Sequence, residues 1–128
     1  MNRLSDTEYE IMDYVWNLTP PFTTAMVMEG VGNARGWKMQ TAITLLNRLT
    51  DRGFIRVEAP IKGRERRLYP VISREEYLRY ETESFVSHYH KSSVASLIGS
   101  LRGERFSRRD IDELSALVES LRKGGEQA

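Results

Sequence analysis

The sequence predicts a mainly α-helical protein with one small β-hairpin. Two observations lead to this fold class. Apolar residues recur at helical spacing along most of the chain, and only the segment 54–71 shows the alternation of strands on both sides of a glycine-centred loop. We expect an N-terminal domain over residues 1–72, a helical region over residues 73–122 and a frayed tail over residues 123–128.

The N-terminal region begins with signals for three helices. Ser5 can cap the first helix while Glu8 reaches back to it, which is the pattern of a capping box. A pair of prolines stops this helix, and two threonines can cap the next one. The third helix is expected over residues 39–52, with Gly53 as its stop signal.

The third helix has two different faces. At 100° per residue, Ala42 and three leucines form an apolar face, whereas Gln40, Thr44 and Arg48 fall opposite it and Thr41 lies at the border. Uncharged hydrogen-bonding side chains near the start, followed by an arginine, suit contacts with DNA base edges and then with a phosphate. An ordinary solvent-exposed helix has the same pattern, so the helix alone does not decide between the two interpretations.

The residues after Gly53 predict a hairpin with a basic tip. Strand-like segments over 54–58 and 66–71 flank a loop around Gly63. Three helices followed by such a hairpin form a winged helix, in which a recognition helix and a wing contact DNA together. The basic residues expected to contact the DNA backbone are Lys38, Arg48, Lys62, Arg64, Arg66 and Arg67.

Positive charge is concentrated in this part of the chain. Between Arg35 and Arg67 there are nine basic and three acidic residues, whereas from Ser73 onward nine basic residues face ten acidic ones. The whole chain carries a net charge of only +1. Such local asymmetry favours a polyanionic partner, and a solvated basic surface is the alternative.

The composition excludes several kinds of site. Without cysteine there can be no disulfide, thiolate metal site or cysteine nucleophile. No apolar run approaches the ~20 residues that span a bilayer, and the N-terminus lacks the apolar core of a secretory signal, so we expect a cytoplasmic protein. His88 and His90, two residues apart on a helix, point in different directions. We therefore expect no metal, no cofactor and no catalysis.

The C-terminal region is expected to form three helices, beginning at a second capping box over residues 73–76. Each helix has an apolar face that needs a partner. A second copy of the chain is the expected partner, and folding back onto the N-terminal domain is the alternative. The residues expected in this dimer interface are Phe85, Val94, Leu97, Ile98, Leu101, Ile111, Leu114 and Val118.

Four stretches taken together carry a family resemblance. They are residues 4–12 (LSDTEYEIM), residues 44–49 (TLLNRL), residues 53–55 (GFI) and residues 106–114 (FSRRDIDEL). In this order and spacing they resemble the penicillinase and methicillin-resistance repressors and their copper-responsive relatives. The resemblance implies a homodimeric repressor. Its winged helices would enter successive major grooves of a pseudo-palindromic DNA operator, and its C-terminal helices would interlock.

The resemblance also implies which side chains read bases. Gln40, Thr41 and Thr44 occupy the base-facing positions, and the family usually has lysine where this chain has Gln40. A glutamine amide can pair with adenine. The family often has a basic residue where Ile43 stands, and we expect Ile43 to touch a thymine methyl group or to pack against Trp37.

The signal that releases the repressor is left open by the sequence. Relatives that control β-lactam resistance are cut by a sensor metalloprotease, and the aligned bond here joins Ser100 and Leu101, where relatives typically have Asn–Phe. The cysteine cluster of the copper-responsive branch is absent. The alternative functions are a regulator that binds a small molecule between its C-terminal helices, a winged helix that binds another protein and, more remotely, a small hydrolase.

Overall fold

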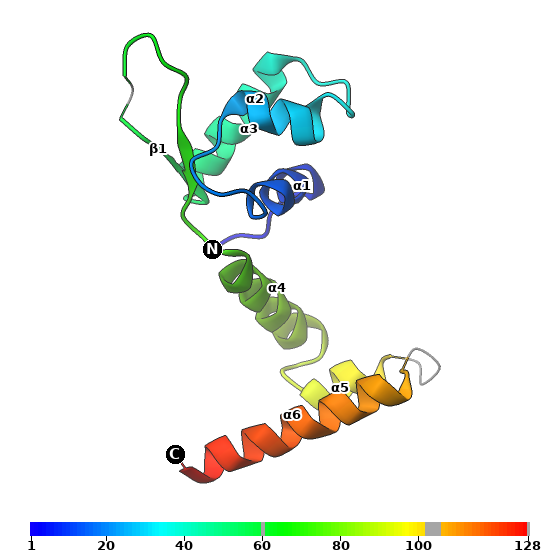
Figure 1. The fold of residues 1–128 in the computed structure, drawn as a ribbon. Helices are drawn as coiled ribbons and strands as arrows, with labels where there is room; N and C mark the ends of the chain where they lie inside the picture. Colours follow the sequence, from blue (N-terminus) through cyan, green and yellow to red (C-terminus); the bar gives the residue numbers. More distant parts are fainter. Residues whose placement is uncertain (60, 102–105, 128) are drawn as a thin grey trace. The chain divides into compact units, whose positions relative to one another are not determined.

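The computed structural model describes residues 1–59, 61–101 and 106–127 (Figure 1). Contacts divide the chain into two units, residues 1–83 and residues 84–128. The expected boundary lay after residue 72. It is corrected because Tyr77, in the first half of the next helix, is buried with the N-terminal core, and its hydroxyl accepts a hydrogen bond from the Leu4 N–H at 2.8 Å.

The N-terminal unit is a winged helix. In chain order it contains α1 (Asp6–Val15), α2 (Thr24–Val27), the π-helical turn η1 (Met28–Gly32), α3 (Met39–Asp51), β1 (Ile55–Val57), β2 (Leu68–Pro70) and the beginning of α4 (Arg74–Tyr89). The two strands pair antiparallel, with Arg56 opposite Tyr69. Phe22 adds an isolated antiparallel bridge to Leu68, so the segment before α2 joins the base of the wing.

The core of this unit lies between the helices and the base of the hairpin. From α3 it takes the side chains of Ala42, Leu46 and Leu49, all fully buried. Phe54 and Leu68 close it from the wing side. Each large apolar side chain that is fully buried contributes about 1.5–3 kcal/mol. This burial confirms the predicted apolar face of the third helix.

Local sequence signals act as predicted at the helix ends. The Ser5 hydroxyl accepts from the Glu8 N–H and the Glu8 carboxylate accepts from the Ser5 N–H, which confirms the first capping box. Ser73 and Glu76 form the same pair of bonds ahead of α4. Gly53 follows α3 with φ +83°, a conformation that glycine adopts without steric cost.

The C-terminal unit contains the end of α4, α5 (Val94–Gly99) and α6 (Arg108–Gln127). Ser93 caps α5 by accepting a hydrogen bond from the Ser96 N–H. In the structure α6 continues to Gln127, and fraying of the tail from residue 123 stays a prediction. Gly124 and Gly125 each cost about 1 kcal/mol relative to alanine, but both keep the backbone N–H that the helix needs.

A buried ion pair ties the start of the chain to the end of α3. The Glu8 side chain is buried, and Arg52 donates to it from Nη1 at 2.6 Å and to the Arg3 carbonyl oxygen from Nη2 at 2.7 Å. Burial is the largest influence on the pKa of Glu8 and raises it. Hydrogen bonds from Ser5 and Arg52 together outweigh burial, so the pKa of Glu8 lies below its ordinary value.

We expect Glu8→Gln to lower the free energy of unfolding by about 2 kcal/mol at pH 7, the scale of a hydrogen bond to a charged group. Because the folded pKa is depressed, the stabilisation by Glu8 is complete above the ordinary carboxyl pKa and is lost as pH falls through the lowered value. The difference between wild type and variant should therefore shrink on acidification. Urea unfolding at pH 7 and in steps down to pH 3 measures it.

The matched control for this experiment is Glu10→Gln. Glu10 also pairs with an arginine, Arg35, but both side chains are more than one-third exposed. An exposed pair contributes about 0–1 kcal/mol, so the control should change stability little. A Glu8→Gln deficit that stayed constant over the whole pH range would contradict the role assigned to the Glu8 carboxylate.

Candidate nucleic-acid interface

The outward face of α3 presents hydrogen-bonding side chains to solvent. Gln40, Thr41 and Thr44 are all exposed. The Gln40 amide nitrogen lies 3.5 Å from the Thr44 hydroxyl oxygen, one helical turn away, so the two groups are aligned on one surface. The predicted base-reading residues therefore share one accessible face, opposite the buried Ala42 and Leu46.

Basic side chains lie at both ends of this helix. Lys38 is exposed at the N-cap position of α3, where no side chain caps the helix. Arg48 is exposed in the last turn. Backbone N–H groups at a helix start and nearby lysine or arginine side chains are the usual partners of DNA phosphates. The helix thus offers polar side chains between two positively charged ends.

The wing tip carries two further exposed cations. Gly63 turns the chain with φ +83°, and the Arg64 N–H donates to the Ile61 carbonyl oxygen at 3.0 Å. Lys62 and Arg64 are exposed, and within the described chain neither forms an ion pair. The predicted wing contacts at these two positions are therefore placed where a phosphate could reach them.

Arg66 contacts α3 in the structure, and its predicted contact with a phosphate stays a prediction. Its side chain is half-buried, and Nη1 donates to the Asn47 side-chain oxygen of α3 at 3.0 Å. Nη2 is buried without a hydrogen-bond partner among the described residues. The arginine thus connects the wing to α3. Asn47 was not predicted as a site residue, although its place on the outward face of the helix is readable from the helical period.

Arg67 and Arg56 are held at the surface of the hairpin. Arg67 lies 4.0 Å from a carboxylate oxygen of Glu58, and both side chains are exposed. The Arg56 guanidinium lies 4.1 Å above the centre of the Tyr69 ring, its cross-strand neighbour. Arg67 remains accessible to a phosphate, with its charge partly balanced by Glu58.

Apolar side chains are exposed on the C-terminal unit. Among the predicted interface residues, Phe85, Val94, Ile98, Leu101, Ile111 and Val118 are exposed, and Leu97 and Leu114 are half-buried. A groove of about 510 Å³ runs between α5 and α6, lined in part by Ile98, Leu114 and Val118. The prediction omitted Leu117 and Leu121, which are exposed at the same helical spacing.

A comparison with protein families identifies the chain. The model of the penicillinase repressor matches residues 4–120, which include the winged helix and most of the C-terminal helices. The chain belongs to the penicillinase repressor family. This is a family of transcriptional repressors, and the predicted resemblance is confirmed.

This penicillinase repressor family member is similar to several individual proteins at low sequence identity. The methicillin resistance regulatory protein MecI of Mammaliicoccus sciuri is 25% identical over 119 residues, covering 90% of this chain and 92% of MecI. Among solved structures, Streptococcus pneumoniae FabT in complex with DNA is 19% identical with a TM-score of 0.45. The match covers 97% of this chain and 77% of the FabT chain. Staphylococcus aureus MarR in complex with salicylate and kanamycin is 14% identical with a TM-score of 0.46. The match covers 97% of this chain and 75% of the MarR chain.

The bond at which cleavage is predicted, between Ser100 and Leu101, lies at the end of α5. Ser100 is the C-cap residue, and its hydroxyl donates to the Ser96 carbonyl oxygen at 2.8 Å. The Leu101 side chain is exposed. Residues 102–105 lie outside the described part of the chain. Cleavage between Ser100 and Leu101 stays a prediction.

The two histidines near the end of α4, His88 and His90, contact different side chains. His90 Nδ1 lies 2.9 Å from the Ser96 hydroxyl, and the His88 ring packs edge-on against Tyr89. Among the residues that the structure describes, no three histidine, aspartate or glutamate side chains gather as metal ligands. In the same residues, no helix has the length and apolar character needed to cross a membrane.

We expect Arg66→Ala to destabilise the N-terminal unit by about 1 kcal/mol, because it removes the hydrogen bond to Asn47. Arg64→Ala, an exposed arginine two residues away, is the matched control and should leave stability within about 0.5 kcal/mol. Urea unfolding of both variants without DNA measures the difference. Equal stability of the two variants would show that Arg66 does not hold the wing.

Proposed function

We propose that this chain is a sequence-specific DNA-binding transcriptional repressor that acts as a homodimer on a pseudo-palindromic operator. The observation that carries the proposal is the exposed polar face of α3, which lies between basic side chains. A basic wing is held beside this helix by the bond between Arg66 and Asn47. Membership of the penicillinase repressor family supports the same function. Repression follows from operator occupancy, which would block access of the transcription machinery.

The proposed contacts divide between specificity and affinity. Gln40, Thr41 and Thr44 would meet base edges in the major groove, where each base pair presents a distinct pattern of donors and acceptors. The side chains proposed to contact phosphates are Lys38, Arg48, Lys62, Arg64 and Arg67. Arg66 would act through its bond to Asn47, by keeping the wing at a defined place beside α3.

Dimerisation is proposed to occur through the C-terminal unit. Val94, Ile111 and Val118 are each at least half exposed in the single chain, and a second copy would cover them. A twofold dimer presents two recognition helices, so its half-sites should lie about one DNA turn apart, ~10 base pairs, or a small multiple of it.

A sensor metalloprotease is the proposed partner for release of the operator. A cut between Ser100 and Leu101 would separate α6 from the rest of the chain and divide the surface proposed for dimerisation. Leu101 is exposed in the single chain, which supports access to the bond.

We expect light scattering to show a dimer at micromolar concentration. Val118→Asp should shift the protein to monomer and weaken operator binding by at least tenfold, because a buried, unpaired carboxylate opposes association. Val71→Asp, at an equally exposed valine after β2, is the control and should remain dimeric. A wild-type monomer would contradict the proposed assembly.

We expect Lys62→Ala with Arg64→Ala to weaken binding to all DNA sequences alike. The slope of log affinity against log salt concentration should fall by about one for each lost phosphate contact. Selection from a random DNA library supplies the operator, and titrations against operator and unrelated DNA at several salt concentrations give the slopes. Unchanged affinity for unrelated DNA would contradict the wing assignment.

Thr44→Ala should act differently from the wing variants. The loss of a base-facing hydroxyl should reduce the ratio of operator affinity to unrelated-DNA affinity by about 5- to 100-fold for each half-site, the cost of one lost base contact. The same titrations measure this ratio. An unchanged ratio would remove Thr44 from the base-reading set.

A further inference from the structure

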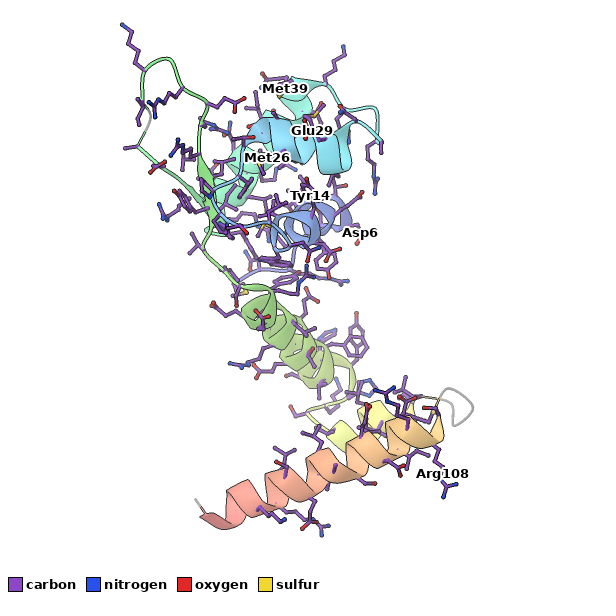
Figure 2. The ribbon with its side chains drawn as sticks, viewed as in Figure 1. Asp6, Tyr14, Met26, Glu29, Met39 and Arg108 are labelled. Atoms are coloured by element: carbon purple, nitrogen blue, oxygen red, sulfur yellow. The ribbon has the colours of Figure 1, made fainter. Side chains whose placement is uncertain are left out.

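An apolar hollow lies beside the polar face of α3. It has a volume of about 400 Å³ between the start of α2, the start of α3 and the wing, and its lining residues are Thr24, Ala25, Met39, Ile43, Glu65 and Arg66. Met39, labelled at the beginning of α3 in Figure 2, is 47% exposed. Ile43 is half-buried. The hollow is therefore open and largely apolar on a surface that is otherwise polar and basic.

The hollow follows one side of the recognition helix. Met39, Ile43 and Asn47 are spaced four residues apart, so they form a row along α3. Asn47 at the end of this row binds Arg66, which places the row on the side of the wing. Gln40 and Thr44 form the neighbouring row on the outward face, one residue further along at each turn.

Apolar side chains in such a position need an apolar partner on the DNA. Phosphates offer only charge, and most base edges in the major groove offer hydrogen-bond donors and acceptors. The exception is the C5-methyl group of thymine, which projects into the major groove beside those edges. A methyl group contacts Met39 and Ile43 favourably, whereas a phosphate or an amino group against these two side chains would lose its hydration, since the charged lining residues Glu65 and Arg66 belong to the wing and not to α3.

We infer that Met39 and Ile43 form a binding site for the 5-methyl group of one thymine in each operator half-site. This inference rests on the proposed function and deepens it, because it assigns a base feature to residues outside the hydrogen-bonding row. The wing contributes by closing the hollow at Arg66, so the tie between Arg66 and Asn47 also shapes the methyl site.

Deoxyuridine differs from thymidine only by this methyl group and tests the inference directly. Each thymine of the selected operator is replaced in turn by deoxyuridine, symmetrically in both half-sites, and the affinity of the wild-type dimer is measured. We expect one position at which the replacement weakens binding by about 15-fold, since burial of one methyl corresponds to about fourfold and two half-sites multiply. 5-Bromodeoxyuridine at that position should restore binding, because bromine has nearly the size of a methyl group.

Protein variants identify the residues that sense the methyl group. Met39→Ala and Ile43→Ala should bind the thymine operator more weakly and should discriminate much less between thymine and uracil at the sensitive position. The matched control is Ile61→Ala, which truncates an exposed apolar side chain on the wing and should keep the full difference. Met39 is exposed, so its variant tests the site without disturbing the core.

The outcomes separate this site from the function on which it rests. An operator bound tightly by the wild type without any dependence on a thymine methyl would overturn the methyl site alone. So would a thymine-to-uracil difference that both alanine variants retain. A selection that recovers no DNA would overturn the proposed function and the site with it.

Discussion

The burial of one face of α3 is the constraint on which the rest of the interface depends. Ala42, Leu46 and Leu49 are fully buried, and together they fix the rotation of the helix about its axis. A turn by a single residue, 100°, would bring a polar side chain into the core and leave it without hydrogen bonds, at a cost of about 1–3 kcal/mol or more. The outward position of Gln40 and Thr44 is therefore a consequence of core packing and needs no separate interaction.

The same rotation determines how the wing attaches. With the leucines buried, Asn47 lies within reach of Arg66, which precedes β2. The 3.0 Å hydrogen bond between their side chains links α3 to the hairpin. A hairpin of two three-residue strands has little stability by itself. The bridge from Phe22 to Leu68 supports its base, and the Arg66 bond supports its flank. The wing is thus positioned by contacts outside its own ladder.

The structure also changes how the positive charge of the sequence should be counted. Several of the nine basic residues between positions 35 and 67 are engaged within the protein. Arg35 pairs with Glu10, Arg52 with Glu8, Arg56 stacks on Tyr69, Arg66 binds Asn47 and Arg67 approaches Glu58. The exposed basic residues of this segment that have neither an ion pair nor an aromatic partner in the described chain are Lys38, Arg48, Lys62 and Arg64. The acids that neutralise Arg35 and Arg52 come from α1, outside the segment over which the charge was counted.

Sequence reasoning succeeded where the determining forces are local. The capping box at Ser5, the stop at Gly53 and the apolar face of α3 depend on residues within a few positions of each other, so helical period and capping chemistry predict them. The role of Arg66 and the inclusion of Tyr77 in the N-terminal unit depend on partners 19 and 73 residues away. No local pattern distinguishes an arginine that will meet an asparagine from one that stays in solvent.

Tyr77 shows how such a distant contact extends a domain beyond its sequence boundary. Its ring packs against Trp16 and Phe54, and its hydroxyl accepts from the Leu4 N–H and donates to Glu81 at 2.7 Å. Burial, with the hydrogen bond to Glu81, raises the pKa of Tyr77 to about 12, so the phenol stays protonated and keeps donating at any physiological pH. The first half of α4 is therefore bound to the winged helix by both apolar and polar contacts. Because α4 then continues without interruption to Tyr89, the helix that leaves the N-terminal unit is the same one that enters the C-terminal unit.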